Sequence, residues 1–291
     1  TTLIVAGGIE RGLEKAVRVL MPALFVMQLI LVVYAYRQGA WSEGVEFLFK
    51  PDWRALTGDS VLIAMGQAFF TLSIGMGAVM AYGAYLPQDT SILGTSVMVI
   101  VADTVVALLA GLIIFPIMFQ YGLSPAEGEG LIFKTLPIAF GNMNGGVIFG
   151  TLFFLLLVLG AWTSAIGLLE PAVAWFIERL SLVRWKAAWL VGGGVWVLGL
   201  VSVFSFNLLA DWQFFKGNWF DNVDYFSTNI LLPVSGFFIA IFAGWKMCQN
   251  SSSEELDIGT AGLYRGWRLL IRWVAPIAVA VIFVRGMGWL G

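Results

Sequence analysis

Long runs without a charged side chain constrain this sequence more than any other feature. Residues 19–36, 60–88, 135–169, 187–210 and 225–245 contain no Asp, Glu, Lys or Arg. A helix needs about 20 apolar residues to cross the ~30 Å hydrocarbon core of a bilayer, and each run approaches or exceeds that length. Hydrophobic residues make up 59% of the chain and charged residues only 12%, about half the share in soluble domains. The sequence therefore predicts an integral membrane protein.

Two further runs bring the number of predicted membrane spans to seven. Residues 90–126 contain one charge, Asp103, and the short run 273–284 continues past Arg285 in uncharged residues. Continuous apolar runs lack the alternation of a barrel strand, so we expect α-helices, whose backbone hydrogen bonds are internal. We expect a single all-α transmembrane domain, 1–291, with approximate spans 16–37, 61–85, 93–121, 147–178, 187–206, 226–248 and 270–290.

Composition disfavours several other classes of protein. The sequence has no His and one Cys, Cys248, so zinc, haem and iron–sulfur sites are disfavoured and no disulfide can form within the chain. A net charge of −2 gives no basic surface for nucleic acid. We see no nucleophile–base pair, so we expect neither an enzyme nor an organic cofactor. The chain begins at Thr1, which suggests the tail of an earlier helix.

The distribution of Lys and Arg predicts the orientation in the membrane. With the N-terminal end in the cytoplasm, ten of the sixteen basic residues fall on the inside, as the positive-inside rule requires. We therefore expect a multi-pass protein of the cell membrane with its C-terminal end outside. The basic residues on the inside would be Arg11, Lys15, Arg18, Arg179, Arg184, Lys186, Lys246, Arg265, Arg268 and Arg272.

The span 61–85 contains an unusual group of small and hydroxylated residues. Thr71, Ser73, Gly75 and Gly77 lie within seven residues near the expected middle of the membrane. Gly weakens a helix by about 1 kcal/mol, and hydroxyl groups compete for the backbone. One interpretation is a broken helix whose exposed backbone groups bind an ion or a zwitterion. The other is a face of small residues for close helix packing.

Asp103 is the one carboxylate in the middle of the third span. A carboxylate at that depth costs roughly 2.5–3.5 kcal/mol on insertion scales, so it is expected to face the bundle interior and bind a cation or a proton. A structural ion pair with a base on another helix is the alternative. No Lys or Arg of this sequence falls at a comparable depth, which favours ion binding.

Two weaker patterns also suggest function. Gly160, Thr163 and Ser164 are spaced along one helix face, where hydroxyl and carbonyl oxygens suit Na⁺, although such residues also serve packing. Gly12 and Pro22 flank the start of the first span, where Pro22 removes an amide donor and permits unwinding or an ordinary kink.

Taken together, these residues resemble the neurotransmitter:sodium symporter family, in particular its bacterial amino-acid transporters of the leucine-transporter type. The resemblance is carried by residues 66–77, by Thr163-Ser164 with Glu170-Pro171, and by Gly12 and Pro22. It implies a leucine-transporter-like inverted-repeat fold of which this chain holds helices five to eleven. The four N-terminal helices of the family would then be missing from this chain, although they would be its partners in the whole protein.

The resemblance also assigns roles to individual residues. Those that match substrate-pocket positions are Phe70, Thr71, Ser73, Met76, Ser164 and Leu168. Those that match sodium-site positions are Thr71 and Asp103 for one ion, and Gly160, Thr163 and Ser164 for a second. Gate positions are matched by Asp224 outside and by Glu178 and Tyr85 inside, and hinge positions by Gly12, Pro22, Gly75 and Gly77.

The implied function is sodium-coupled symport of an amino acid by alternating access, with Na⁺ as the coupling ion. The carboxylate of Asp103 stands where many family members have Asn, and its charge predicts independence from chloride. Met76 gives a deformable apolar pocket, which favours a hydrophobic or aromatic substrate. The alternatives are a proton-coupled or exchange transporter of the same fold and a non-transporting membrane subunit.

Overall fold

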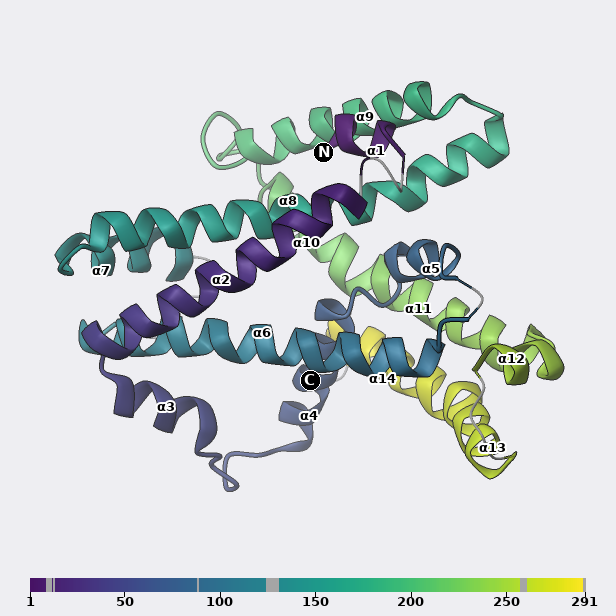
Figure 1. The fold of residues 1–291 in the computed structure, drawn as a ribbon, viewed down its shortest axis with the longest axis horizontal. Coiled ribbons are helices and arrows are strands. Elements are labelled where there is room, and N and C mark those ends of the chain that lie inside the picture. Colours follow the sequence, from purple (N-terminus) through teal and green to yellow (C-terminus); the bar gives the residue numbers. More distant parts are fainter. Residues whose placement is uncertain (9–11, 13, 88, 124–130, 257–260, 290–291) are drawn as a thin grey trace. The chain divides into compact units, whose positions relative to one another are not determined.

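The structure, a computed structural model, describes residues 1–8, 12, 14–87, 89–123, 131–256 and 261–289 (Figure 1). The described part is almost entirely helical, and its β-structure amounts to one isolated bridge between Phe214 and Gly217. The predicted all-α fold is therefore confirmed.

Six helices of the described residues are long and apolar enough to cross a membrane. Two of them contain π-helical turns, in which each amide bonds five residues back instead of four. The four others are α2 (Lys15–Gln38), α6 (Ile92–Gln120), α8 (Gly146–Leu180) and α9 (Arg184–Phe204). The first with π turns consists of α10 (Trp219–Tyr225), η3 (Phe226–Leu231), α11 (Leu232–Ile241) and η4 (Phe242–Lys246). The second consists of α13 (Ala261–Leu269), η5 (Leu270–Val274) and α14 (Ala275–Gly286).

The remaining helices are short. The expected span 61–85 is divided into two of them, α4 and α5, and the expected span 270–290 ends outside the described residues. The short helices are α1 (Thr2–Ala6), α3 (Trp41–Phe49), α4 (Gly58–Thr71), α5 (Ala78–Gly83), η2 (Leu131–Thr135), α7 (Leu136–Asn142) and α12 (Gln249–Leu256).

The chain forms two compact units, and each is described by itself. Unit 1 contains Thr1–Leu56 and Val101–Gly167, and unit 2 contains Thr57–Ile100 and Leu168–Gly291. The boundary between the units passes through α8, after Gly167.

Unit 1 is held together by an apolar core that α2, α6, α7 and α8 share. Leu31, Ile117 and Leu136 are fully buried, and van der Waals packing of this kind holds helices together in a bilayer, whose lipid tails are as apolar as these side chains. The Tyr34 and Phe149 rings stack 3.7 Å apart, and the Tyr34 hydroxyl donates to the carbonyl of Asn144 at 3.1 Å. These contacts fix the C-terminal half of α2 against the start of α8.

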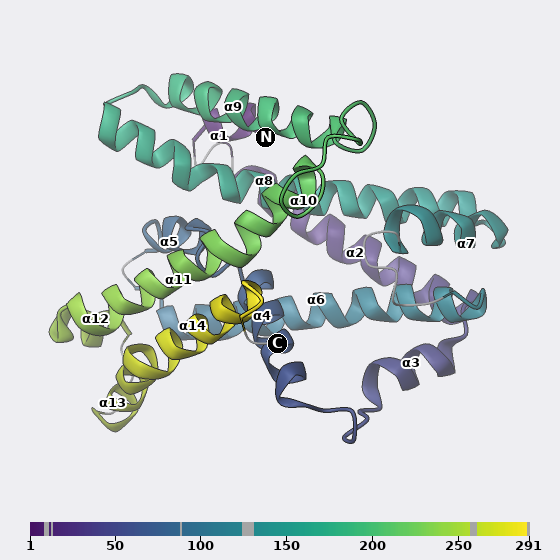
Figure 2. The ribbon, with the colours of Figure 1, turned by 180° about the vertical axis from the view of Figure 1, so that it is seen from behind.

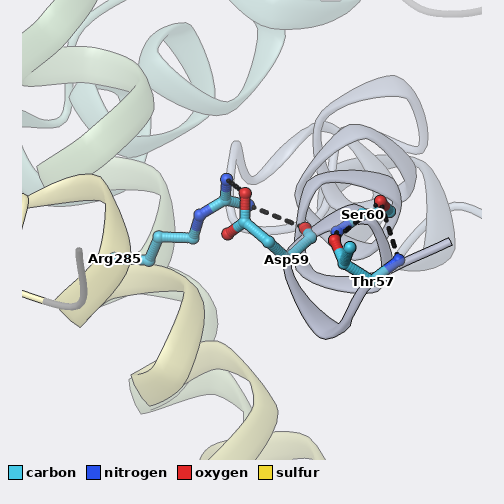
Figure 3. Close-up of polar contacts among 4 residues, drawn as sticks. All are labelled: Thr57, Asp59, Ser60 and Arg285. Atoms are coloured by element: carbon cyan, nitrogen blue, oxygen red, sulfur yellow. Dashed lines mark hydrogen bonds and ion pairs between the residues drawn. The ribbon is translucent and has the colours of Figure 1, made fainter. Parts of the chain in front are cut away.

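Unit 2 is organised around α11 and α14, which lie side by side in both views (Figures 1 and 2). Pro233, Ala240 and Val279 are buried on these two helices. At the C-terminal end of α14, Arg285 donates to the Asp59 carboxylate at 2.8 Å and to the Asp59 carbonyl at 3.2 Å (Figure 3). This contact attaches the N-terminus of α4 to α14.

Candidate substrate and sodium site

The helix break between α4 and α5 is the central feature of the candidate site. Residues 72–77 leave the helical conformation, and Ser73, Gly75 and Gly77 take positive φ values of 54°, 89° and 80°. The Ile74 amide bonds to the Phe69 carbonyl at 3.1 Å and the Met76 amide to the Ser73 carbonyl at 3.3 Å. The regular helical hydrogen-bond pattern therefore stops here, as the Gly, Ser and Thr content of the segment predicted.

Glycine is needed in this segment for two separate reasons. Left-handed φ values cost a residue with a side chain about 1–2 kcal/mol, whereas Gly adopts them freely. At Gly75 there is also no room, because a Cβ atom would lie 2.7 Å from the Leu232 carbonyl oxygen of α11. At Gly77 a Cβ atom would meet Pro171 of α8 at an ordinary 3.4 Å, so only the backbone conformation demands Gly.

A second close contact fixes α4 against α11 just before the break. The ring of Phe69 occupies the space that a side chain at the buried Gly236 would need. The break is thus packed on α11 at two points, through Gly75 and through Phe69.

A cavity of about 300 Å³ lies within unit 2 beside the C-terminal half of α4, and its lining residues on α4 end at Phe70, two residues before the break. Phe70, predicted to line the substrate pocket, and Asp224, predicted as a gate, both line it. The Thr228 hydroxyl donates to the Asp224 carboxylate at 3.3 Å. The full lining is Gly66, Gln67, Phe69, Phe70, Asp224, Thr228, Asn229, Leu232, Pro233 and Ile282.

The other predicted site residues of unit 2 lie on or next to the same elements. Thr71 is the last residue of α4, whose C-terminal end carries the negative end of the helix dipole. Ser73 and Met76 lie in the break and are half-buried, and Leu168 is exposed on α8.

In unit 1, Asp103 is half-buried near the middle of α6. On α8, the Thr163 hydroxyl donates to the Gly160 carbonyl at 2.8 Å, and Ser164 follows as an exposed residue. Two of the three groups predicted to coordinate the second sodium ion, the Gly160 carbonyl and the Thr163 hydroxyl, are therefore hydrogen-bonded to each other. If the Thr163 hydroxyl hydrogen rotated away from the carbonyl, both oxygens would be adjacent and free to coordinate a cation.

The predicted gates and hinges occupy varied environments. Glu178 lies exposed near the end of α8, and Tyr85 is 50% exposed in the turn after α5. Pro22 lies inside α2, which continues through it, so the possible unwinding there is absent from this structure. Gly12 lies so close to the Ile4 carbonyl that no side chain would fit at position 12.

Glu170 of α8 forms a buried ion pair. Its side chain is 1% exposed, and Arg184 at the start of α9 donates to it at 2.5 Å. The second carboxylate oxygen, Oε1, is buried and has no hydrogen-bond partner among the described residues. The pair joins α8 to α9.

The sequence reasoning missed three polar or kink-forming residues of the cavity wall, namely Thr228, Asn229 and Pro233. The signal that could have found them is the position of Thr228 four residues after Asp224, at the start of an otherwise apolar helix. The π-helical turn η3 carries both Thr228 and Asn229, and such turns recur at functional sites.

Comparisons with known proteins agree with these features. The model of a family described as the sodium:neurotransmitter symporter family matches residues 1–288. YhdH, a sodium-dependent transporter of Bacillus subtilis, is 33% identical over 100% of this chain and 65% of its own length. A sodium-dependent transporter of Haemophilus influenzae is 32% identical over 98% of this chain and 63% of its own length. The chain thus spans less than two thirds of these relatives.

One solved structure is also similar to this chain in both fold and sequence. The crystal structure of MhsT in complex with L-phenylalanine matches with a TM-score of 0.87 and 40% identity, over 98% of this chain and 65% of MhsT. A helical bundle of membrane-spanning length with one span broken at glycines defines a polytopic membrane protein of the leucine-transporter-like fold. Within that class, the chain belongs to the sodium:neurotransmitter symporter family.

Proposed function

We propose that this chain is part of a sodium-coupled symporter that carries hydrophobic or aromatic amino acids by alternating access. The observation that carries the proposal is the break at residues 72–77, with left-handed conformations at Ser73, Gly75 and Gly77. Irregular backbone at membrane depth is tolerated where it lines a cavity or binds a ligand, and a cavity lies beside α4 just before this break.

The proposed sodium ligands are oxygen atoms, which hard cations prefer. Thr71 and Asp103 would serve one ion, and the Gly160 carbonyl with the Thr163 and Ser164 hydroxyls would serve another. Support for the first comes from the negative dipole end of α4 at Thr71. Support for the second comes from the contact between the Thr163 hydroxyl and the Gly160 carbonyl.

The proposed substrate pocket uses Phe70, Thr71, Ser73, Met76, Ser164 and Leu168. Its apolar residues fit a hydrophobic or aromatic side chain, and a sodium ion bound nearby would attract the substrate carboxylate. MhsT, the similar structure, is a complex with L-phenylalanine. We therefore take phenylalanine as the first substrate to test.

The decisive test is uptake of radiolabelled phenylalanine into proteoliposomes that contain the whole protein of which this chain is part. Asp103→Ala is expected to abolish uptake driven by an inward sodium gradient, because it removes a carboxylate ligand. Glu254→Gln, which changes an exposed carboxylate on α12, is the charge-matched control and is expected to retain full uptake.

Three outcomes would contradict the proposal. Undiminished uptake by the Asp103→Ala protein would exclude this residue from the sodium site. Uptake that persists in choline and follows a pH gradient would favour proton coupling. Binding of phenylalanine without accumulation would favour a non-transporting subunit.

The proposed independence from chloride has its own test. Asp103 supplies a fixed negative charge beside the proposed ion, so no mobile anion is required to balance Na⁺. Replacing chloride by gluconate on both sides of the membrane is expected to leave the initial rate of uptake unchanged. A loss of uptake in gluconate that chloride restores would overturn this assignment.

A further inference from the structure

Two π-helical turns of unit 2 face each other at one end of the α11–α14 pair. These are η4 and η5, and their closest approach is at Gly244, where a Cβ atom would lie 2.8 Å from the Cα atom of Arg272. The Trp245 indole N–H donates to the Arg272 carbonyl at 3.1 Å, and the Trp245 and Trp273 rings lie 5.0 Å apart. The contact holds both helices in a fixed register.

Four basic residues surround this contact, and we call them the basic cluster: Lys246, Arg265, Arg268 and Arg272. Arg265, Arg268 and Arg272 are spaced three and four residues apart, so they lie on one side of their helix. None of the four takes part in the ion pairs found among the described residues. The carboxylates of the adjacent α12, Glu254 and Glu255, are exposed and take no part in them either.

The two inner arginines are held in place yet keep unused hydrogen-bond donors. Arg268 donates to the Tyr264 hydroxyl at 2.9 Å, and that hydroxyl in turn contacts the buried Ser252 at 2.6 Å. The Arg272 guanidinium lies 4.3 Å from the centre of the Trp245 ring. Within the described part of the chain, the Nε atoms of Arg268 and Arg272 are buried without a hydrogen-bond partner. Both guanidinium groups are thus held in position, and neither takes part in an ion pair among the described residues, so their remaining N–H groups suit an oxyanion with several acceptor atoms.

Next to the basic cluster, the same helix exposes a strip of large apolar side chains. Leu269, Leu270, Trp273, Val274 and Ile277 are each about half exposed or more. Trp273 of this strip packs against the exposed Trp245, with ring centres 5.0 Å apart, beside the basic cluster. Basic residues next to tryptophans and exposed aliphatic side chains are typical of the boundary between the headgroups and the acyl chains of a bilayer.

We propose that the basic cluster binds the phosphate headgroup of an anionic phospholipid, whose acyl chains lie along the apolar strip. The distribution of Lys and Arg assigns this end of the chain to the cytoplasmic leaflet. The lipid fits because its phosphate matches the unpaired donors and its negative charge matches a cluster without carboxylate partners. This inference is independent of the transport proposal, since its test measures lipid binding alone.

The test is native mass spectrometry of the purified protein released from micelles that contain phosphatidylglycerol or phosphatidylcholine. The wild-type protein is expected to retain one more phosphatidylglycerol than the Arg268→Gln/Arg272→Gln variant, and to show no such difference with phosphatidylcholine. Each basic residue near a membrane surface contributes on the order of 1 kcal/mol, so the affinity for phosphatidylglycerol is expected to fall roughly 30-fold. Arg37→Gln/Arg54→Gln removes two exposed charges of unit 1 and is the charge-matched control.

A second variant keeps the test valid if the first fails to fold. Lys246→Gln/Arg265→Gln changes two exposed side chains of the same cluster and is also expected to weaken the retention of phosphatidylglycerol. Equal retention in both cluster variants and the control would overturn the proposal. Competition by millimolar inorganic phosphate would overturn it too, because the site would then bind the free anion rather than a lipid.

Discussion

Ser73 adopts a left-handed conformation, with a φ of 54°, two residues before Gly75. Its neighbours Gly75 and Gly77 adopt the same region without the steric cost that a side chain imposes. At the scale of single residues, the break is therefore fixed by local backbone preference. This is why the sequence predicted it: the Gly, Ser and Thr of residues 66–77 are visible without any knowledge of the neighbouring helices.

The two glycines of the break are expected to differ in their tolerance of alanine. Gly75→Ala should lower the thermal unfolding midpoint in detergent more than Gly77→Ala, because only position 75 lacks room beside the Leu232 carbonyl. For Gly77→Ala the cost should stay near the ~1–2 kcal/mol of the left-handed backbone. Gly83→Ala, at the last residue of α5, where a Cβ atom would meet open space, is the control and should be neutral or stabilising. Equal losses at positions 75 and 77 would contradict the steric argument.

Cys248 is expected to react with alkylating reagents at a lower pH than an ordinary thiol. Backbone hydrogen bonds from Asn250 and Ser251 lower its pKa, and Arg268 adds to the effect. Because the pKa is lower in the folded protein, the thiolate persists to lower pH when folded than when unfolded. The rate of labelling by iodoacetamide against pH, in native protein and in denaturant, measures the difference.

The control for this titration is Arg268→Gln, which should move the native pKa part of the way back toward the unfolded value. Coincident titration curves for native and denatured protein would show that the backbone hydrogen bonds do not act on the thiol. Since Cys248 is the one cysteine of the sequence, all of the signal from this chain comes from it.

At the scale of elements, charge-free runs predict membrane-spanning helices, because length and hydropathy determine such a helix almost alone. They could not predict the π-helical turns η3, η4 and η5, which depend on packing between helices distant in sequence. The sequence could not predict the contact between Arg285 and Asp59 either, because 226 residues separate the two partners.

The Arg285–Asp59 contact is expected to contribute modestly to the attachment of α4 to α14. Asp59 is 63% exposed and the Arg285 side chain 24%, so solvent screens the pair. A double-mutant cycle with Asp59→Asn and Arg285→Gln should give a coupling of about 0.2–1 kcal/mol in thermal stability, decreasing in high salt. A coupling that salt leaves unchanged would instead assign the interaction to the bond between Arg285 and the Asp59 carbonyl.

Within the Glu170–Arg184 pair, Arg184→Gln should lower the stability of the protein more than Glu170→Gln. Arg184→Gln leaves a carboxylate that is 1% exposed, whereas Glu170→Gln leaves a guanidinium that is 24% exposed and able to reach water. Removing one partner of a buried pair costs about 3–5 kcal/mol, and Arg184→Gln should lie at the upper end. Thermal unfolding of both variants and of the double variant gives the comparison. A larger loss for Glu170→Gln would contradict the argument from exposure.

At the scale of the whole molecule, the sequence suggested the family and most of the candidate site, because the residues concerned lie in compact motifs. It indicated Asp103, since a lone carboxylate in an apolar span is conspicuous, and it indicated Thr163 through its spacing from Gly160. It did not indicate that Asn229 and Pro233 line the cavity, because the cavity forms only where α4 packs beside α11.

The orientation of the chain in the membrane can be checked with Cys248. The positive-inside rule assigns its loop to the cytoplasm. A membrane-impermeant maleimide should therefore label it in inverted vesicles and leave it unlabelled in right-side-out cells, in a protein whose only cysteine is Cys248. A cysteine placed at Trp53, exposed in the loop before α4, should show the reverse pattern. Labelling of Cys248 from outside would invert the assigned orientation.

The contact between the Phe69 ring and Gly236 limits how α4 can move along α11. The ring fits where a side chain is missing, and Phe237 follows immediately on the same helix. Sliding α4 lengthwise would drive the ring out of this space and against bulkier neighbours, whereas tilting about the contact keeps the ring in place. The two residues together act as a pivot, and the motion that they leave open to α4 is a rotation.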